Sequence, residues 1–404
     1  MQSSTYRLDA DLDPVTVGAR SGLLWTRGGF SLAGVGEAVR IDVRSAAQAH
    51  LAKLAGHDEV MSAGTGPVGF GALPFDTSAA ATLVVPEIVV GRNADGRRWI
   101  TVTGAVPVDV EAALVRVHAI AQRPVPSGPQ PTRYDMVSSL SPEEWRDDVL
   151  TVGRDRVRAG DLRKVVLARR VEVRTDHPVD TAVVVERLHQ AFGSAIVFSI
   201  DGFVGASPEL LVSRTGDVVR SHPLAGTAPR SSDPAADGRL AAALMASSKD
   251  RWEHRITIDW LLENLLPFCS YVDAEAEPSI VSLANVHHLG TLVEGRLSQP
   301  SASVLELVDA LHPTPAVGGD PQDVAVAMIA ALEGTDRGNY AGPVGWVDAA
   351  GNGAFAVGLR SGQFTPGGAT VFAGVGVVAD SDPEAELAET RTKFQAILGA
   401  LLRP

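Results

Sequence analysis

The chain has little lysine and almost no cysteine. Of its 35 basic residues only four are lysines, namely Lys53, Lys164, Lys249 and Lys393. Arginine stays protonated at every working pH, whereas a buried lysine can lose its proton and act as a base. A lysine kept in such an arginine-rich chain can therefore mark chemistry that a guanidinium does not perform. Three of the four lie in the segments KVVLARR, SSKDRWEH and ETRTK, which are the first places to look for a site.

Other absences exclude whole classes of protein. The single cysteine, Cys269, rules out an internal disulfide and a zinc site built from thiolates. No apolar run approaches the ~20 residues that span a bilayer, and the first residues lack the basic and apolar stretches of a signal peptide. A net charge of −13 argues against nucleic acid or an anionic membrane as a partner. We expect a cytoplasmic, monomeric protein that binds neither.

One proline-rich segment divides the chain. A length of 404 residues suggests two domains or one unusually large one. Residues 123–133, RPVPSGPQPTR, carry four prolines and a glycine and predict a connector. Residues 1–122 contain few motifs with chemical meaning, whereas residues 134–404 hold nearly all of the polar clusters. We therefore expect the active site in the second part.

The second part shows clear strand and helix patterns. Alternating apolar and charged residues from Lys164 to Arg174 predict a strand with one buried face. Two hairpins and one further strand are predicted over 209–214 with 218–221, 345–348 with 354–360, and 369–378. Helices are predicted over 141–158, 181–192, 247–266, 303–311, 321–333 and 382–402. A capping box at Ser381–Glu384 begins the last of these helices, and Pro267 ends the third.

Several familiar motifs are incomplete. Residues 64–69 match GxGxxG, but no apolar strand precedes them and no helical pattern follows, so a loop is predicted. Residues 205–209 lack the second glycine of a nucleophile elbow. The chain has neither a Walker A motif nor HExxH. The sequence thus favours neither a nucleotide site nor a hydrolase or zinc-protease site.

Acidic residues recur at helical spacing in two helices. Asp250 and Glu253 are three residues apart, and Glu386, Glu389 and Lys393 fall within about 60° on one helix face. Two solvated faces would explain this spacing, and that is the commoner case. If the two faces meet, each pair of carboxylates about 4 Å apart repels by roughly 4 kcal/mol at an effective dielectric of ~20, so a bound cation would be needed. With oxygen ligands and no cysteine, that cation would be Mg²⁺.

Other candidates also have two interpretations. Lys164 and Glu209 stand at strand ends, where charged side chains are ordinarily solvated, although Glu209 could also lie at the edge of a cleft. His287 and His288 are equally well explained as histidines satisfied near a turn. Each of these residues therefore needs support from its neighbours before it counts as functional.

Three residues near the C-terminus suit an anionic ligand. Arg360 ends the apolar segment AFAVGLR, so its guanidinium needs an anionic partner. Gly374 and Gly376 in AGVGVV leave backbone N–H groups open to close approach.

Taken in order, these motifs resemble the chorismate-utilising enzymes and, among them, isochorismate synthase. The matching stretches are collinear from about residue 135 to the end: KVVLAR (164–169), GASPELL (205–211), PLAGTAPR (223–230), SSKDRWEH (247–254), VHHLGTLVEGRL (286–297), LHPTPAVGG (311–319), RGNYAGPVGW (337–346) and SDPEAELAETRTK (381–393). LLWTRGGFSLAGVGEA is similar to the family's N-terminal hairpin. The resemblance implies one large α+β domain of antiparallel sheets flanked by helices, with the site in a cleft, in place of two domains.

The resemblance also implies roles for the matched residues. Lys164 would be the general base and Glu209 the general acid, with His288 beside the substrate ring. The Mg²⁺ ligands would be Glu253, Glu386 and Glu389, with Asp250 in support through water. The residues implied to contact chorismate are Gly226, Thr227, Ala316, Tyr340, Arg360, Gly374, Gly376 and Lys393.

The implied reaction is the reversible isomerisation of chorismate to isochorismate, in which water adds at C2 and the C4 hydroxyl leaves. Family members that use ammonia usually carry Gln at the position of Lys164, and the aminodeoxychorismate branch has a lysine at the position of Ala225. Both differences favour water here. An alanine at position 316 is similar to isochorismate synthase, whereas salicylate and anthranilate synthases tend to have threonine there.

Two alternatives are left open. The protein could be a salicylate synthase that also eliminates pyruvate, or a chorismate-binding paralogue without catalysis. Menaquinone and siderophore synthesis both stay open as the destination of the product.

Overall fold

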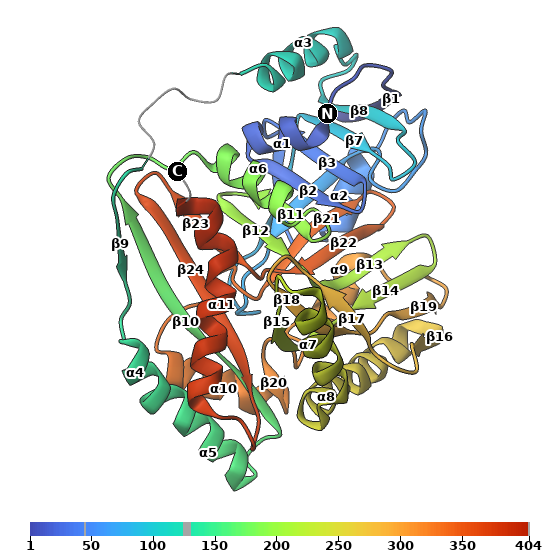
Figure 1. Cartoon of the computed structure of the whole chain (residues 1–404). Helices are drawn as coiled ribbons and strands as arrows, with labels where there is room; N and C mark the ends of the chain where they lie inside the picture. Colours follow the sequence, from blue (N-terminus) through green and yellow to red (C-terminus); the bar gives the residue numbers. More distant parts are fainter. Residues whose placement is uncertain (44–45, 124–130, 403–404) are drawn as a thin grey trace.

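Two large antiparallel sheets form the framework of the molecule (Figure 1). The computed structural model describes residues 1–43, 46–123 and 131–402. The first sheet has 12 strands, in the order β1 (Gln2–Arg7), β8 (Arg98–Gly104), β7 (Ile88–Arg92), β3 (Phe30–Val35), β2 (Leu23–Arg27), β11 (Ile196–Ile200), β12 (Phe203–Ser207), β23 (Ser361–Thr365), β24 (Gly368–Val377), β10 (Lys164–Thr175) and β20 (Gly319–Asp320), with β9 (Tyr134–Val137) paired to β10.

The second sheet faces the first, and a third, smaller sheet lies beside the site. The second has nine strands, in the order β16 (Cys269–Ala274), β19 (Val293–Leu297), β14 (Val218–His222), β13 (Leu210–Thr215), β22 (Gly353–Val357), β21 (Pro343–Asp348), β5 (Val68–Ala72), β6 (Thr82–Val85) and β4 (Val39–Asp42). The third has three strands, in the order β15 (Leu224–Pro229), β18 (Val286–Gly290) and β17 (Ser279–Ser282).

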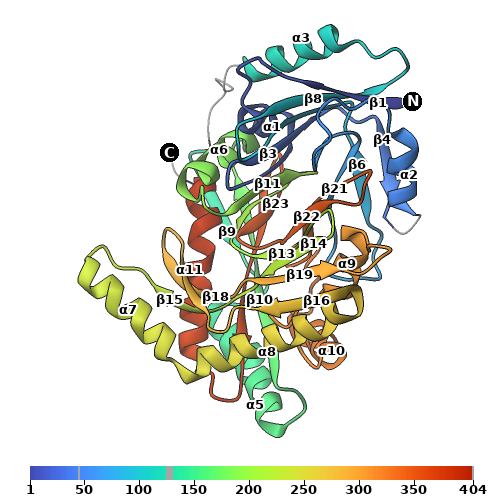
Figure 2. The same cartoon turned by 90° about the vertical axis from the view of Figure 1, so that its right-hand side faces the viewer.

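Helices cover the outer faces of these sheets. They are α1 (Pro14–Ser21), α2 (Ala47–Leu54), α3 (Val110–Ala121), α4 (Pro142–Glu144), α5 (Val152–Ala159), α6 (Thr181–Ala191), α7 (Pro234–Ala246), α8 (Ser248–Leu265), α9 (Val304–Leu311), α10 (Gln322–Glu333) and α11 (Pro383–Leu402), with a π-helical segment at Trp145–Thr151. In Figure 1, α11 runs along the long strands β10 and β24. In Figure 2, α7 projects from one side and leads into α8 below the third sheet.

A hydrophobic core between the two large sheets joins the N-terminal residues to the rest. Aromatic side chains from both sheets fill it, including Trp25, Phe70, Phe198 and Trp346. Strand β2 pairs with β11 in the first sheet and β5 pairs with β21 in the second, so residues 1–122 contribute strands to both large sheets. The N-terminal part is therefore continuous with the sheets that carry the site.

The predicted fold class is confirmed. Each predicted helix has a helical counterpart, although residues 145–151 of the first are π-helical. Both predicted hairpins are present, but the second strand of the latter ends at Val357. The strand predicted from Lys164 is β10, whose first six residues are buried on both faces, whereas one buried face was predicted. The similarity of LLWTRGGFSLAGVGEA to a hairpin is confirmed by β2 and β3. Of residues 64–69, which were predicted to form a loop, 64–67 lie outside helices and strands, but Val68 and Gly69 begin β5. Of the predicted connector at 123–133, residues 124–130 lie outside the described residues. No helix within the described part of the chain is long and apolar enough to cross a membrane.

One predicted helix start is wrong in detail. A capping box would place Ser381 at the N-cap, but the helix begins at Pro383 and the side chain of Asp382 accepts a hydrogen bond from the N–H of Glu384. The Ser381 hydroxyl instead accepts from the N–H of Val378 at 3.1 Å. The serine is thus used to close the turn that follows β24.

Candidate active site

One cavity gathers every residue that the sequence predicted for the site. It has a volume of about 100 Å³ and lies between β10, β24, the third sheet and the helices α8 and α11. The predicted residues all line it: Lys164, Glu209, Gly226, Thr227, Asp250, Glu253, His288, Ala316, Tyr340, Arg360, Gly374, Gly376, Glu386, Glu389 and Lys393. Motifs spread over most of residues 134–404 therefore meet at one place.

Lys164 is the first residue of β10 and is completely buried. It pairs with Asp320 of β20, and a Cβ on the neighbouring Gly319 would lie 2.3 Å from the Lys164 carbonyl oxygen. The glycine, with φ of 143°, therefore allows β20 to close over the end of the strand. The interpretation of Lys164 as a solvated strand end is wrong, because β20 and the side chain of Glu253 cover it.

Glu209 lies in the short link between β12 and β13 and is 3% exposed. Its N–H donates to the Ser207 hydroxyl at 3.2 Å, and the N–H of Leu224 donates to its carboxyl group. Burial raises the pKa of Glu209 to about 8, although Lys164 and the Leu224 N–H oppose the rise. The carboxyl group is therefore protonated at neutral pH, and the interpretation as a solvated acid is wrong.

Three lysines neutralise three carboxylates in the cavity. The pairs are Lys164–Glu253 at 2.9 Å, Lys249–Glu386 at 2.9 Å and Lys393–Glu389 at 2.7 Å. Lys393 also donates to the carbonyl oxygen of Gly374 at 2.8 Å. Three of the chain's four lysines thus occupy one small volume, in agreement with the significance that their scarcity suggested.

The carboxylates also repel one another. Burial raises the pKa of Asp250, and the charges of Glu253 and Glu389 add to the rise. Burial and the charge of Glu389 likewise raise the pKa of Glu386. Burial acts on Glu389 in the same direction, but Lys393 and the Thr227 hydroxyl hold its pKa below the usual value. The two acidic helix faces therefore meet, as their like-charged spacing suggested.

This donor set suits a hard divalent cation. It offers only carboxylate oxygens, which Mg²⁺ prefers, and a cation would relieve the repulsion between them. Within residues 1–43, 46–123 and 131–402, no three His, Cys, Asp or Glu side chains are gathered closely enough to hold a metal ion. The three glutamates turn toward the lysines instead, so metal binding would require ammonium groups to give way.

Arg360 and His288 form a buried pair in the cavity wall. His288 Nδ1 donates to the carbonyl oxygen of Gly226 at 2.9 Å, which leaves Nε2 to accept from Arg360 Nη2 at 3.2 Å. Burial and the charge of Arg360 lower the pKa of His288 to about 3, so the ring is neutral. Arg360 Nη1 is buried and has no hydrogen-bond partner among the described residues. A guanidinium with an unsatisfied buried N–H group is suited to an anionic ligand.

The backbone at Arg360 differs from the sequence prediction. The predicted strand ran from Ala354 to Arg360, but β22 ends at Val357 and Arg360 has φ of 51°. A left-handed conformation costs an L-residue about 1–2 kcal/mol. The strained backbone conformation occurs at the residue whose guanidinium lines the cavity.

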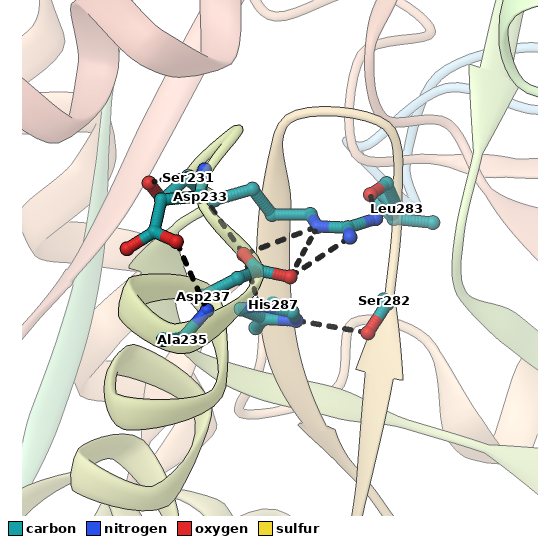
Figure 3. A network of polar contacts seen from close by, with 8 residues as sticks. Ser231, Asp233, Ala235, Asp237, Ser282, Leu283 and His287 are labelled. Atoms are coloured by element: carbon teal, nitrogen blue, oxygen red, sulfur yellow. Dashed lines mark hydrogen bonds and ion pairs between the residues drawn. The ribbon is translucent and has the colours of Figure 1, made fainter.

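A second polar network supports the cavity wall from outside (Figure 3). Asp237 of α7 accepts hydrogen bonds from the Arg230 guanidinium, the Ser231 N–H and His287 Nε2. Because His287 and His288 are adjacent in β18, their side chains point to opposite faces of the small sheet. The interpretation of His287 as a satisfied histidine is confirmed, and its bonds fix the strand that presents His288 to the cavity.

Known proteins are similar to this chain in sequence and in fold. A family model described as chorismate binding enzyme matches residues 20–402. The chain belongs to this family. Isochorismate synthase DhbC of Bacillus subtilis is 38% identical over 347 residues, which cover 83% of this chain and 81% of the relative. The salicylate biosynthesis isochorismate synthase of Pseudomonas aeruginosa is 38% identical over 334 residues, which cover 80% of this chain and 70% of the relative. A crystal structure of DhbC from Bacillus anthracis is 32% identical, with a TM-score of 0.78 and 97% of each chain covered.

The sequence patterns assigned no role to two charged residues of this cavity, Lys249 and Arg337. Lys249 lines the cavity, although only its segment was noticed through the scarcity of lysine. Arg337 donates to Glu333 and to the carbonyl oxygens of Val166 and Val317, so it ties β10 to the segment that carries Ala316. The collinear motif RGNYAGPVGW contained Arg337, but nothing in its spacing indicated a buried ion pair.

The close packing at Gly376 provides a test of the cavity. A Cβ at this position would lie 2.2 Å from Glu253 Oε1 and 3.1 Å from Lys164 Cε. We therefore expect Gly376→Ala to force this pair apart and to weaken chorismate binding by about tenfold or more, measured by calorimetry. Gly367→Ala, in the turn before the same strand, meets no atom within 4 Å and serves as the control. Unchanged chorismate binding by Gly376→Ala would show that the pair does not border the substrate.

Proposed function

We propose that this protein is an isochorismate synthase, an isomerase that converts chorismate reversibly into isochorismate and depends on Mg²⁺. One observation carries the proposal: a buried lysine and a buried, protonated glutamate line the same cavity. Such a pair supplies a base for a nucleophilic water and an acid for a leaving hydroxyl group. Membership of the chorismate-binding enzyme family and the names of the relatives support the choice of substrate and reaction.

The polar groups of the cavity suit a substrate with two carboxylates. Arg360 Nη1 has an unused N–H group that faces a buried region, and a guanidinium binds carboxylates strongly. Lys393 and the backbone at Gly226, Thr227, Gly374 and Gly376 would bind the remaining carboxylate oxygens. These donors would fix the ring with C2 toward Lys164 and C4 toward Glu209.

Glu253, Glu386 and Glu389 would hold Mg²⁺, with Asp250 in support through water. When bound, the ion would neutralise the ring carboxylate and draw electron density from the ring.

The proposed reaction balances with the groups of this chain. Lys164 would act as a neutral amine, which requires that it first give up its proton and its ion pair with Glu253. In that form it takes a proton from a water molecule, and the oxygen of that water bonds to C2. The C1=C2 electron pair moves to C1–C6, the C5=C6 pair moves to C4–C5, and the C4–O bond breaks. Glu209 gives its proton to the departing hydroxyl group, which leaves as water. The lysine has gained one proton and the glutamate has lost one, so the reverse reaction uses the same two groups with exchanged roles.

The products of a long incubation test the function as a whole. We expect chorismate and isochorismate to approach the same mixture from either side, with little salicylate or pyruvate. The small side chain of Ala316 offers fewer contacts than threonine to hold the ring in the pose that pyruvate elimination needs. Chromatography with and without EDTA measures this, and EDTA should abolish turnover. Stoichiometric salicylate and pyruvate would favour a salicylate synthase, and chorismate bound but unchanged would favour a non-catalytic paralogue.

Lys164→Arg tests the base. The variant keeps the positive charge that pairs with Glu253, but a guanidinium does not accept a proton from water. We expect kcat to fall by roughly 10²–10⁴-fold while chorismate still binds. Stopped-flow or steady-state assays measure the first quantity and calorimetry the second. Near-normal turnover would remove Lys164 from the role of base.

Glu209 should set the alkaline limit of activity. Because the acid works only in its protonated form, kcat should fall as the pH rises through about 8. Glu209→Gln should lower kcat by roughly 10²–10⁴-fold and should remove this fall from its residual activity. Measuring kcat as a function of pH for the wild type and for Glu209→Gln tests this assignment. A variant that keeps the alkaline fall would assign that titration to another group.

A further inference from the structure

Lys249 has no role in the proposed reaction, yet it occupies an unfavourable position in its helix. It is the second residue of α8, just after the N-cap Ser247. Amide dipoles make the first turn of a helix electropositive, so a cation there is disfavoured. A chain with only four lysines keeps one here. Something other than helix stability must therefore account for this ammonium group.

The surroundings of Lys249 are those expected of a bound cation. Its Nζ donates to Glu386 Oε1 at 2.9 Å. Burial acts to lower the pKa of Lys249, but the charges of Glu386, Glu253 and Asp250 outweigh it and raise the pKa above the usual value. Its ammonium group thus lies in the field of three of the four carboxylates that would surround Mg²⁺.

Lys249 is also the lysine best placed to leave. Its side chain is 38% exposed, whereas that of Glu386 is 6% exposed. Lys164 is completely buried, and Lys393 is held by a second bond to the carbonyl oxygen of Gly374. Of the three lysines, Lys249 has the most exposed side chain, so it can turn into water by rotating its own side chain when another cation takes its place beside Glu386.

We propose that Lys249 is a resident counter-ion, which neutralises Glu386 while the metal is absent and releases it when Mg²⁺ binds. This inference rests on the Mg²⁺ site of the proposed function. It accounts for lysine rather than arginine at this position, because a guanidinium can form two parallel hydrogen bonds with a carboxylate and would compete more strongly with the metal.

The exchange has two consequences for the enzyme. The acidic cluster does not need the metal in order to fold, because the ammonium group compensates the charge of Glu386. Metal affinity is lower than the carboxylates alone would give, because Mg²⁺ must break the ion pair before it binds. Mg²⁺ and a dicarboxylate carry opposite double charges, so the cavity keeps its balance of charge when both enter.

Calorimetric titration of Mg²⁺ into the chorismate-free enzyme tests the exchange without an activity assay. Lys249→Gln leaves no ion pair to break, so Mg²⁺ should bind about 5- to 30-fold more tightly than to the wild type. In EDTA the same variant should melt at a lower temperature than the wild type, and Mg²⁺ should raise its melting temperature by more. Lys249→Arg, which keeps the charge and strengthens the pair, should bind Mg²⁺ more weakly than the wild type.

Arg251→Gln is the matched control. Arg251 lies in the same turn of α8, and its guanidinium pairs with Glu277 at 2.6 Å in an exposed position. Its removal takes away one positive charge without touching Glu386, and screening by solvent should keep the Mg²⁺ affinity within about twofold of the wild type.

The possible outcomes separate this inference from the proposed function. If Lys249→Gln binds Mg²⁺ no more tightly than the wild type, while the activity of the wild type needs Mg²⁺, the counter-ion role of Lys249 is overturned and the proposed function stands. Equal tightening by Arg251→Gln would also overturn it, because the effect would then be one of net charge. A wild type that binds no Mg²⁺ and keeps its turnover in EDTA would overturn the metal assignment and the exchange with it.

Discussion

The balance between ammonium and carboxylate groups inside one cavity is the constraint on which the site depends. A charge removed from water without a partner is costly, and breaking a buried ion pair by removing one member typically costs 3–5 kcal/mol. The cavity holds three lysine–glutamate pairs within bonding distance. Each pair joins different parts of the fold or fixes one helix face, so the correct arrangement of β10, α8 and α11 and the neutralisation of the site are achieved together.

Glycine residues make this approach of the helices possible. Gly374 and Gly376 of β24 pair with Ala168 and Val166 of β10, directly beneath α8 and α11. A side chain at Gly376 would occupy the space of the Glu253 carboxylate. Because both glycines lack a Cβ, the backbone of β24 forms the floor of the cavity and the acidic side chains lie against it. The strand thus supplies polar backbone groups where any other residue would supply bulk.

Local patterns in the sequence predicted much of this arrangement. The spacing of Glu386, Glu389 and Lys393 placed them on one helix face, and the collinear motifs placed Lys164, Glu209 and His288 at one site, as the cavity now shows. Features that depend on contacts between distant parts of the chain could not be predicted from local patterns.

The burial of Lys164 depends on β20, which pairs with it from far along the chain. The left-handed backbone of Arg360 and the ion pair of Lys249 depend on contacts that no local pattern records. The helix α7 was missed because its alanine-rich sequence, PAADGRLAAALMA, has only Leu244 fully buried and so lacks a clear apolar stripe.

The pairing of Arg360 with a neutral histidine decides what the cavity can bind. A carboxylate in place of His288 would neutralise the guanidinium internally and remove its affinity for an anion. A protonated histidine would have no lone pair at Nε2 to accept the hydrogen bond from Arg360. The carbonyl oxygen of Gly226 fixes the ring in the tautomer that accepts from Arg360, and burial keeps it neutral. The histidine therefore orients Arg360 while leaving its positive charge undiminished. Elsewhere in the cavity the lysines are already matched by glutamates, whereas Arg360 forms no ion pair in the described part of the chain, so its guanidinium favours a small anion over a neutral molecule as the ligand.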